Sequence, residues 1–286
     1  MTELVVGAVQ MRSGVTPEHN IAVMKDLVRQ AASRGARYVQ TPEMTGALQR
    51  DRAGLRQILR TEADDPVLRA ASELAGELGI YLHIGSTAID AGGGMTANRA
   101  VVFGPDAAVI GRYDKIHMFD VDLDNGESWR ESAVYRPGET ARTIDLNGAR
   151  LGLGICYDIR FPHLFRDLAL AGAEILTAPA AFTRQTGEAH WHVLQRARAI
   201  ENGAFVISAA QSGVHEDGRE TYGHSLIVDP WGRVIAEAMD GEPGVIVASL
   251  ALDEVKAARA KIPNLKNARS YRLDSDMETA RGAHVA

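Results

Sequence analysis

Short apolar runs alternate with segments of helical periodicity through the first third of the chain, and this alternation restricts the fold more than any other feature. Residues 4–9 form an apolar run of strand length, which is typical of a buried strand, and residues 38–41 are predicted to form the next strand. Between them, residues 17–31 carry apolar side chains at the spacing of an amphipathic helix, with Pro17 at its first position and Gly35 after its end. Strands that alternate with helices in this way predict an α/β fold.

The rest of the chain combines strand pairs with helices and shows no boundary between domains. The patterns predict helices over residues 66–78 and 188–202, one strand over 222–228, and a hairpin that turns at Asn147 and Gly148. No Pro-, Gly- or Ser-rich linker and no internal repeat divides the 286 residues. We therefore expect one α/β domain with a mixed sheet or with two sheets.

The composition excludes several classes of partner. Charged residues make up 24% of the chain and the net charge is −6, so a basic surface for nucleic acid or anionic membranes is not expected. The first ten residues lack the features of a signal peptide, and no apolar run is long enough to cross a bilayer. Since Cys156 is the only cysteine, it cannot form an internal disulfide. We therefore expect a cytoplasmic protein without nucleic-acid or membrane partners.

The single cysteine stands where a predicted strand meets a predicted helix. Leu151, Leu153 and Ile155 alternate with small residues before Cys156, and Pro162 begins a segment of helical periodicity. The N-terminus of a helix at this point would stabilise a thiolate. A lone cysteine after an apolar run is, however, commonly an inert core residue, so this stretch alone leaves both interpretations open.

A carboxylate and an ammonium group stand at the ends of other predicted strands. Glu43 follows the strand at 38–41, and Lys115 follows the strand pair within 98–113. Taken singly, each is typical of a solvated surface side chain. Together with Cys156, they supply a base, an oxyanion donor and a nucleophile, each at the end of a strand.

The competing constellations are incomplete. Ser225 lies in a sequence that begins like a serine nucleophile elbow but lacks the second glycine and the following helix. His190 and His192 face different directions on a helix and have no third ligand nearby in the sequence. We interpret these two histidines, with His117 and His224, as structural or surface residues and expect no metal site.

Longer motifs surround these candidates and are very specific when taken together. They are Thr41-Pro42-Glu43, Tyr113-Asp114-Lys115-Ile116-His117, Gly154-Ile155-Cys156-Tyr157-Asp158-Ile159-Arg160-Phe161-Pro162, Gly187-Glu188-Ala189-His190-Trp191, and Tyr222-Gly223-His224-Ser225 with Asp229-Pro230-Trp231-Gly232. With these motifs the chain resembles the nitrilase superfamily of carbon–nitrogen hydrolases, and within it the Nit branch, over nearly its whole length.

The resemblance implies a fold and an assembly. It implies a four-layer α-β-β-α sandwich of the α/β class, with a single carbon–nitrogen hydrolase domain over residues 1–271 and a C-terminal tail over residues 272–286. It also implies a homodimer or a higher homo-oligomer, and an enzyme that needs no metal or organic cofactor.

The resemblance also implies a Glu–Lys–Cys active site on Glu43, Lys115 and Cys156, the residues reached above from their strand ends. A second glutamate is expected in the loop before the cysteine strand. Glu127 and Glu131 are both candidates, and the family's spacing from a Glu-Ser pair to a Pro-Gly pair selects Glu131.

The implied mechanism proceeds through a thioester. Glu43, made more basic by burial, takes the thiol proton, and Cys156 attacks the amide carbonyl. Lys115 and the backbone N–H of Tyr157 hold the oxyanion, and water activated by Glu43 with the help of Glu131 then releases the acid. We expect an amidase that converts a carboxylate-bearing linear amide, of the deaminated glutathione or α-ketoglutaramate type, to the acid and ammonia.

One arginine is the candidate for substrate selection. Arg160 lies one turn beyond Cys156 and can form a bidentate pair with a carboxylate, although an ion pair with Asp158 is the structural alternative. An N-carbamoyl amino acid amidohydrolase, or another carbon–nitrogen hydrolase of the superfamily, is the alternative function. A catalytically idle scaffold is disfavoured because the glutamate, the lysine and the cysteine are all present.

Overall fold

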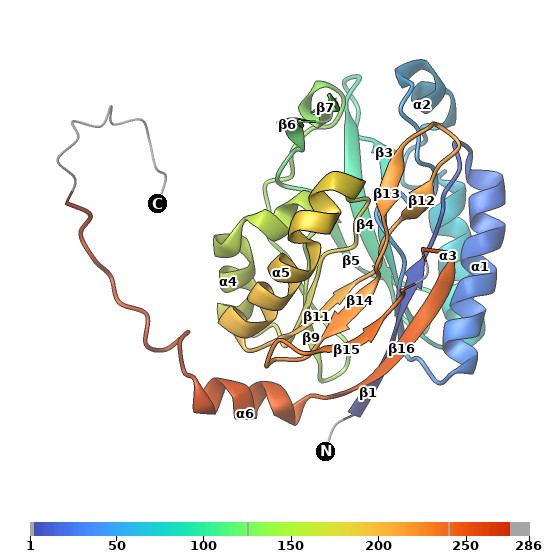
Figure 1. Ribbon diagram of the computed structural model, residues 1–286. Coiled ribbons are helices and arrows are strands. Elements are labelled where there is room, and N and C mark those ends of the chain that lie inside the picture. Colours follow the sequence, from blue (N-terminus) through green and yellow to red (C-terminus); the bar gives the residue numbers. More distant parts are fainter. Residues whose placement is uncertain (1–2, 125, 240, 275–286) are drawn as a thin grey trace.

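The computed structural model describes residues 3–124, 126–239 and 241–274 of the chain. Two six-stranded sheets pack face to face, and helices cover the outer face of each sheet (Figure 1). The layers therefore run helix, sheet, sheet, helix. Among the described residues, no helix combines the length and the apolar character that a membrane crossing requires.

The first sheet has the strand order β16-β1-β2-β3-β4-β5. Its central pairs β1–β2 and β2–β3 are parallel, and the other pairs are antiparallel. The bounds are β1 Glu3–Gln10, β2 Tyr38–Gln40, β3 Tyr81–Asp90, β4 Thr96–Phe103, β5 Val109–Asp114 and β16 Gly244–Ala251.

The second sheet has the strand order β15-β14-β11-β10-β9-β8. Its central pairs β9–β10 and β10–β11 are parallel, and the outer pairs are antiparallel. The bounds are β8 Thr143–Asp145, β9 Arg150–Gly152, β10 Ile175–Thr177, β11 Phe205–Ser208, β14 Leu226–Val228 and β15 Val234–Glu237.

Two pairs of helices complete the layers. Helices α1 (Pro17–Ser33) and α3 (Pro66–Leu78) cover the first sheet, and α4 (Pro162–Leu170) and α5 (Arg184–Asn202) cover the second (Figure 1). The short α2 (Arg52–Ile58) and two small hairpins lie at the upper end in that view, and α6 (Asp253–Lys261) lies at the lower end. The hairpins are β6 (Asp120–Asp122) with β7 (Ser128–Arg130), and β12 (Ser212–Val214) with β13 (Glu220–Tyr222).

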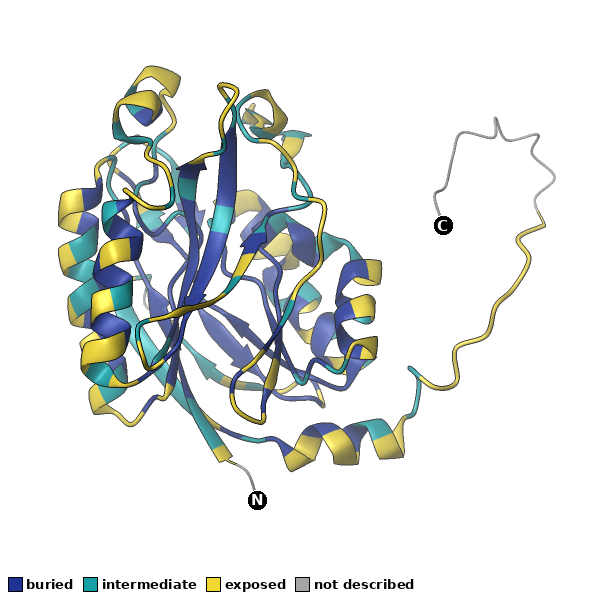
Figure 2. Ribbon diagram, turned by 180° about the vertical axis from the view of Figure 1, so that it is seen from behind, coloured by how far each residue is buried: buried dark blue, intermediate teal, exposed yellow. Residues whose placement is uncertain are grey.

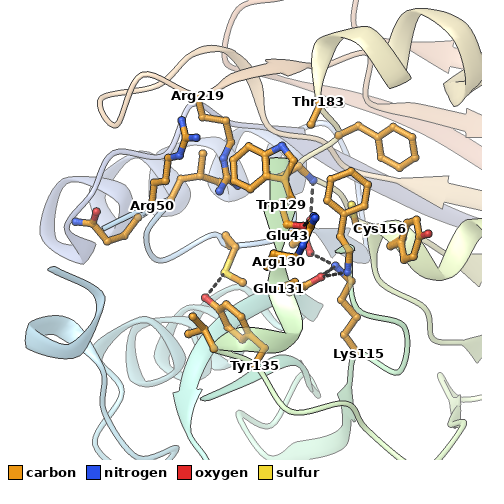
Figure 3. Close-up of a pocket in the computed structure, with 18 of the residues that line it drawn as sticks. Glu43, Arg50, Lys115, Trp129, Arg130, Glu131, Tyr135, Cys156, Thr183 and Arg219 are labelled. Carbon is orange, nitrogen blue, oxygen red and sulfur yellow. Dashed lines mark hydrogen bonds and ion pairs between the residues drawn. The ribbon is translucent and has the colours of Figure 1, made fainter. Parts of the chain in front are cut away.

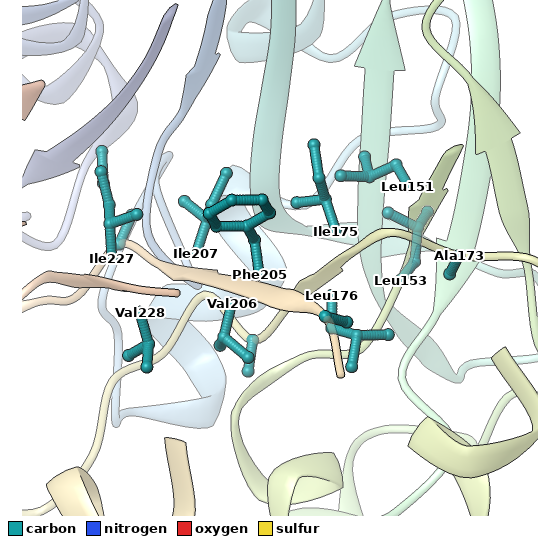
Figure 4. Packing of buried hydrophobic residues seen from close by; sticks show 14 of the residues in the cluster. Leu151, Leu153, Ala173, Ile175, Leu176, Phe205, Val206, Ile207, Ile227 and Val228 are labelled. Atoms are coloured by element: carbon teal, nitrogen blue, oxygen red, sulfur yellow. The ribbon is translucent and has the colours of Figure 1, made fainter. Parts of the chain in front are cut away.

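Alternation of side chains along the strands gives each sheet two apolar faces. On β1, Val6 and Ala8 pack between the sheets, whereas Val9 packs with the residues of α1 and α3. In the second sheet, Phe205 and Val206 point to opposite faces (Figure 4). The central strands of both sheets are buried on both sides (Figure 2), as is typical of parallel strands covered by other layers.

A buried polar group joins the two sheets at their middle. Gln40 on β2 accepts a hydrogen bond from the backbone N–H of Ala209, just beyond β11, at 2.8 Å. Beside it, the hydroxyl of Tyr38 lies 2.7 Å from Nδ1 of His83. Burial lowers the pKa of His83 to about 3, so this imidazole is neutral at physiological pH.

Most predicted elements agree with the structure, and three differ from it. Helix α5 begins at Arg184, four residues before the predicted start. The single strand predicted over 222–228 is two strands, because Gly223 and His224 have positive φ and turn the chain between them. The cysteine lies not on an α-helix but on the short 3₁₀ helix Cys156–Arg160, and α4 begins after it.

The last regular element of the described chain ends at Lys261. The expected domain boundary at residue 271 therefore falls after the sandwich, and residues 275–286 of the expected tail lie outside the described residues. The division into a domain and a tail remains a prediction.

Acidification will destabilise the fold through His83. The unfolded chain binds a proton on this ring near pH 6.5, whereas the folded chain does so only at about pH 3. Stability is therefore complete above pH 6.5 and is lost as the pH falls, by about 2 kcal/mol between pH 6.5 and 5. Urea unfolding of the wild type and of His83→Asn at both pH values measures this loss.

The expected result is a smaller loss of stability in His83→Asn than in the wild type. The matched control is His19→Asn, since His19 is exposed on α1 and its replacement should leave the pH dependence unchanged. Equal slopes in the wild type and in His83→Asn would contradict the argument.

Candidate active site

A cavity of about 330 Å³ opens where strand ends from both sheets meet (Figure 3). Glu43, Lys115 and Cys156 line it, and so do Glu131 and Tyr157. The outer wall comes from the segment leading into α2, from the β6–β7 hairpin and from the loop before α5.

Three strands bring the glutamate, the lysine and the cysteine to this cavity. Glu43 follows β2 by three residues, Lys115 follows β5 directly, and Cys156 begins the 3₁₀ helix after β9. The β2 and β5 strands belong to the first sheet and β9 to the second. The site is therefore assembled across the interface of the two sheets, at the strand ends where ligands gather in α/β proteins.

Lys115 lies between two carboxylates. Its Nζ is 3.0 Å from Oε1 of Glu43 and 2.9 Å from Oε2 of Glu131. The lysine and Glu43 side chains are only 2% and 6% exposed, so these are buried ion pairs. Such an arrangement is stable only when further hydrogen bonds satisfy each charged atom.

Asn98 provides some of these further hydrogen bonds. It was not among the residues predicted from the sequence. Its Nδ2 donates to Oε1 of Glu43 at 2.9 Å and to Oε1 of Glu131 at 3.1 Å. Its backbone oxygen accepts from the N–H of Lys115 at 2.9 Å. An amide among the mostly apolar residues of the strand Thr96–Phe103 was the available signal, because a buried group of this kind requires partners.

The loop that carries Glu131 is fixed on both sides. Oε2 of Glu131 accepts from the backbone N–H of Phe119 at 2.6 Å. Farther along, the N–H of Gly138 donates to the oxygen of Lys115 at 2.8 Å. A Cβ at Gly138 would lie 2.1 Å from the oxygen of Asp114, so only glycine allows the loop to approach β5 this closely.

The structure separates the two glutamates that the sequence left as candidates for this position. Glu131 contacts Lys115 through both carboxylate oxygens, at 3.1 and 2.9 Å. Glu127 instead accepts a hydrogen bond from Nε1 of Trp129 at 3.1 Å. Of the two, the geometry places Glu131 in the buried cluster.

Cys156 occupies a strained turn. Its φ is +48°, a left-handed conformation that costs a non-glycine residue of the order of 1–3 kcal/mol. The backbone N–H of Cys156 donates to the oxygen of Pro179 at 2.9 Å. The side chain of Asp158 also accepts from the N–H of Ile155 at 2.9 Å. These bonds from both sides hold the nucleophile in this conformation.

Asp158 ties the turn to the lysine strand. Its Oδ2 accepts from the hydroxyl of Tyr113 at 2.7 Å, and its Oδ1 lies 2.7 Å from Nδ1 of His117. Tyr113 and His117 stand two residues before and after Lys115. Asp158 therefore fixes the distance between the segment of Lys115 and that of Cys156. The structural interpretation of His117 agrees with this geometry.

The protonation of the cluster differs from the expectation in two respects. Burial and the neighbouring Glu43 carboxylate hold the pKa of the Cys156 thiol well above its usual value, so the helix N-terminus does not produce a resting thiolate. Burial alone would raise the pKa of Glu43, but Lys115 and the hydrogen bonds from Cys156 and Asn98 lower it. The expectation of a Glu43 made basic by burial was wrong, because sequence spacing does not reveal a lysine 3.0 Å away.

The charge of the lysine follows from the same neighbours. Burial lowers the pKa of Lys115, yet the charges of Glu131 and Glu43 raise it well above the usual value. At rest the cavity therefore holds a protonated lysine, two carboxylates and a neutral thiol.

The alternative of an Arg160–Asp158 ion pair was wrong, since Asp158 is occupied as described above. The guanidinium of Arg160 lies 5.3 Å from the ring centre of Phe182 and 5.9 Å from that of Tyr157. Nη1 is 3.3 Å from Nδ1 of His190, and burial lowers the pKa of Arg160. Among the described residues no carboxylate forms an ion pair with it, and two aromatic rings that line the cavity hold it in place.

The remaining polar candidates lie outside the lining of the cavity. Ser225 is buried, and its hydroxyl accepts from the backbone N–H of Ala210. His192 and His224 approach the same oxygen of Glu237, at 2.8 and 2.7 Å. In the sequence, the nearest histidine to His192 is His190, and the two were not expected to share a metal ion. In the folded chain, His192 instead lies beside His224, 32 positions away.

Comparison with known proteins agrees with this geometry. The sequence profile of the family described as Carbon-nitrogen hydrolase matches residues 5–260. The chain belongs to the carbon–nitrogen hydrolase family. It is a hydrolase that acts on carbon–nitrogen bonds other than peptide bonds, and the resemblance to the Nit branch is confirmed.

Two relatives and one solved structure illustrate the similarity. The deaminated glutathione amidase of Yersinia enterocolitica is 38% identical over 92% of both chains. The omega-amidase NIT2 of Homo sapiens is 33% identical over 94% of this chain and 96% of its own.

The solved structure is a glutamate-to-glutamine variant of the amidase from Nesterenkonia sp. AN1. It is 25% identical with a TM-score of 0.76, over 91% of this chain and 98% of that one. That structure shows the product of Michael addition of acrylamide at the active-site cysteine of the Nesterenkonia enzyme. The predicted four-layer sandwich is confirmed by the topology and by this likeness.

Alkylation of the thiol will report the charge that surrounds it. Because Glu43 raises the pKa of Cys156, Glu43→Gln should lower it and increase the thiolate fraction. We expect iodoacetamide to label Cys156 about tenfold faster at pH 8 in Glu43→Gln than in the wild type. Intact mass spectrometry gives the rate directly, since the chain has one cysteine.

Glu73→Gln is the matched control, because Glu73 is exposed on α3, on the outer face of the first sheet. Its labelling rate should equal that of the wild type. A slower reaction in Glu43→Gln would show that the carboxylate activates the thiol toward iodoacetamide and would contradict the argument.

Proposed function

We propose that this hydrolase is an amidase that cleaves carboxylate-bearing linear amides through a thioester on Cys156. The observation that supports it most is the buried Glu43–Lys115–Glu131 cluster, which lines the same cavity as Cys156, and this cavity is large enough for a small substrate. The relatives described above are named as amidases, which agrees with this proposal.

Acylation begins from the neutral thiol. Glu43 accepts the thiol proton as the sulfur attacks the amide carbonyl, so a separate thiolate does not have to accumulate. The oxyanion that develops is held by the ammonium group of Lys115 and by the backbone N–H of Tyr157. The lowered pKa of Glu43 makes this proton transfer uphill in the resting enzyme, and the negative charge that moves toward Lys115 compensates for it.

The leaving group departs when the carbon–nitrogen bond of the tetrahedral intermediate breaks. The proton held by Glu43 passes to the nitrogen, and the amine leaves with the electron pair of that bond. A primary amide such as α-ketoglutaramate releases ammonia. Deaminated glutathione is a secondary amide, so it releases a peptide amine instead, and the expectation of ammonia holds only for primary amides.

Deacylation uses the same groups again. Glu43, now a carboxylate, removes a proton from a water molecule that attacks the thioester carbonyl. Glu131 keeps Lys115 charged and in place, so the second oxyanion finds the same donors. Sulfur leaves as the thiol, and the acid product is released. These steps use the side chains named above, the backbone N–H of Tyr157 and water.

The acyl half of the substrate is proposed to carry a carboxylate that binds Arg160. This guanidinium lies against Tyr157, the residue after the nucleophile, and forms no ion pair with a described carboxylate. A carboxylate can accept two parallel hydrogen bonds from such a group. The α-keto acid end of α-ketoglutaramate or of deaminated glutathione has this chemistry.

The assembly is proposed to be a homodimer, and the location cytoplasmic. Leu170 on α4, Val193 and Ile200 on α5, and Trp231 in the β14–β15 turn are more than half exposed, and apolar surface of this kind favours association. We expect light scattering to give twice the mass of one chain, and the monomer mass would contradict this. A free catalytic thiol suits a reducing compartment.

Removal of the thiol will abolish hydrolysis. Cys156→Ala has no nucleophile, so kcat should fall by about 10⁴-fold or more. During turnover of α-ketoglutaramate by the wild type, acid quenching and intact mass analysis should reveal an adduct of the acyl mass that Cys156→Ala lacks. Full activity in Cys156→Ala would overturn the proposal.

The same assay with several substrates tests the substrate class. We expect a higher kcat/KM for α-ketoglutaramate than for a neutral amide of similar length, and a higher KM for α-ketoglutaramate in Arg160→Gln. An N-carbamoyl amino acid, which releases carbon dioxide as well as ammonia, tests the alternative function. Preferred cleavage of the carbamoyl compound would favour that alternative.

A further inference from the structure

Two arginines lie on one tryptophan ring in the wall of the cavity. The guanidinium carbon of Arg219 is 4.2 Å from the ring centre of Trp129, and that of Arg50 is 5.1 Å from the same centre. All three residues line the cavity that contains Cys156. Figure 3 shows them together on the side of the cavity away from the cysteine.

Three separate segments bring these side chains together. Arg50 stands just before α2, Trp129 lies on β7, and Arg219 closes the turn of the β12–β13 hairpin. The backbone of this turn is fixed, because the N–H of His215 donates to the oxygen of Arg219 at 2.8 Å. The ring orients both cations by cation–π attraction.

The positive charge of this cluster is not neutralised within the described chain. Neither Arg50 nor Arg219 forms an ion pair with a described carboxylate. Nε of Arg219 is buried and has no hydrogen-bond partner there. Two acids stand close to the cluster in the sequence. Glu127 accepts from Nε1 of Trp129 at 3.1 Å. Asp217 accepts through Oδ1 from the backbone N–H of Arg219 at 2.9 Å, and its Oδ2 has no hydrogen-bond partner among the described residues.

A guanidinium group without a counter-ion keeps N–H donors for an incoming anion, and Arg50 and Arg219 both line the cavity. A planar carboxylate matches a guanidinium group by two parallel hydrogen bonds. Arg160 already lies beside the nucleophile, against Tyr157. Arg160 is not itself in the lining of the cavity and lies behind Tyr157 and Phe182, which do line it. Arg50 and Arg219 form a second cationic place, on the side of the cavity away from the cysteine (Figure 3).

We propose that Arg50 and Arg219, oriented by Trp129, form a subsite for a carboxylate on the leaving amine of the substrate. The inference rests on the proposed amidase function and narrows it. The preferred substrates are secondary amides whose amine half is an amino acid or a short peptide with a free carboxyl end. Cleavage of the carbon–nitrogen bond then returns that amine, protonated at nitrogen, with its carboxylate still on the two arginines.

Three substrates with the same acyl half distinguish a defect in this subsite from a defect in the catalytic centre. They are deaminated glutathione, its C-terminal carboxamide, and α-ketoglutaramate. Each releases α-ketoglutarate, so one coupled assay measures all three. The quantity of interest is the ratio of kcat/KM for the free carboxylate to kcat/KM for the carboxamide, because a defect of folding or of the nucleophile lowers both values and leaves their ratio unchanged.

In the wild type we expect a ratio of about 10 to 100, as for the loss of one or two hydrogen bonds to a charged group. Arg219→Gln should lower the ratio about tenfold. Arg50→Gln should lower it less, because Arg50 is exposed. Arg219→Lys retains the charge but lacks the planar guanidinium group, so its ratio should lie between those of the wild type and of Arg219→Gln. Arg56→Gln is the matched control, since Arg56 is exposed on α2 and does not line the cavity.

A ratio near one in the wild type would overturn the subsite, and so would an unchanged ratio in Arg219→Gln. If the wild type cleaves none of the three substrates, the proposed function fails, and binding decides the subsite. Calorimetric titration with cysteinylglycine and with its carboxamide should then give tighter binding of the carboxylate, lost in Arg219→Gln. Equal binding of both peptides would overturn the subsite.

Discussion

The site depends on one buried cation. Lys115 is 2% exposed and lies about 3 Å from two carboxylates. In a place with so little water, a lysine without both acids would lose its proton, and the acids without the lysine would repel each other. Breaking a buried pair of this kind typically costs about 3–5 kcal/mol. The same charges that stabilise the cluster set the protonation of the thiol, so stability and reactivity cannot be varied independently here.

The balance of charge explains why the thiol is neutral at rest. The cluster of Glu43, Lys115 and Glu131 carries one net negative charge, and a thiolate at Cys156 would add a second beside it. The carbonyl oxygen of a bound amide changes this balance, because negative charge leaves the sulfur and gathers near Lys115 as the bond forms. The thiol is therefore activated by the substrate itself. This limits side reactions of the only cysteine with other electrophiles.

The parts of the site that strand ends determine could be predicted from the sequence. Glu43, Lys115 and Cys156 each follow a strand, and the four-layer fold then brings those ends to one cavity. Asn98 could not be predicted in the same way, because its role depends on the register of β4 beside β5. The expectation of a basic Glu43 was wrong, and so was the alternative in which Arg160 pairs with Asp158. Both failed for one reason, which is that spacing along the chain carries no information on distances across two sheets.

The arginine cluster on Trp129 was even less predictable from the sequence. Arg50, Trp129 and Arg219 come from a loop, a short hairpin and a second hairpin, and no motif connects them. Each alone is an ordinary surface residue in the sequence, because only the folded chain reveals that two guanidinium groups lie on one ring. The catalytic residues, in contrast, stand on elements whose ends are fixed by the sheets. A fold of this kind can keep its chemistry constant while exchanging the residues of its outer wall, and with them the amine that it accepts as the leaving group.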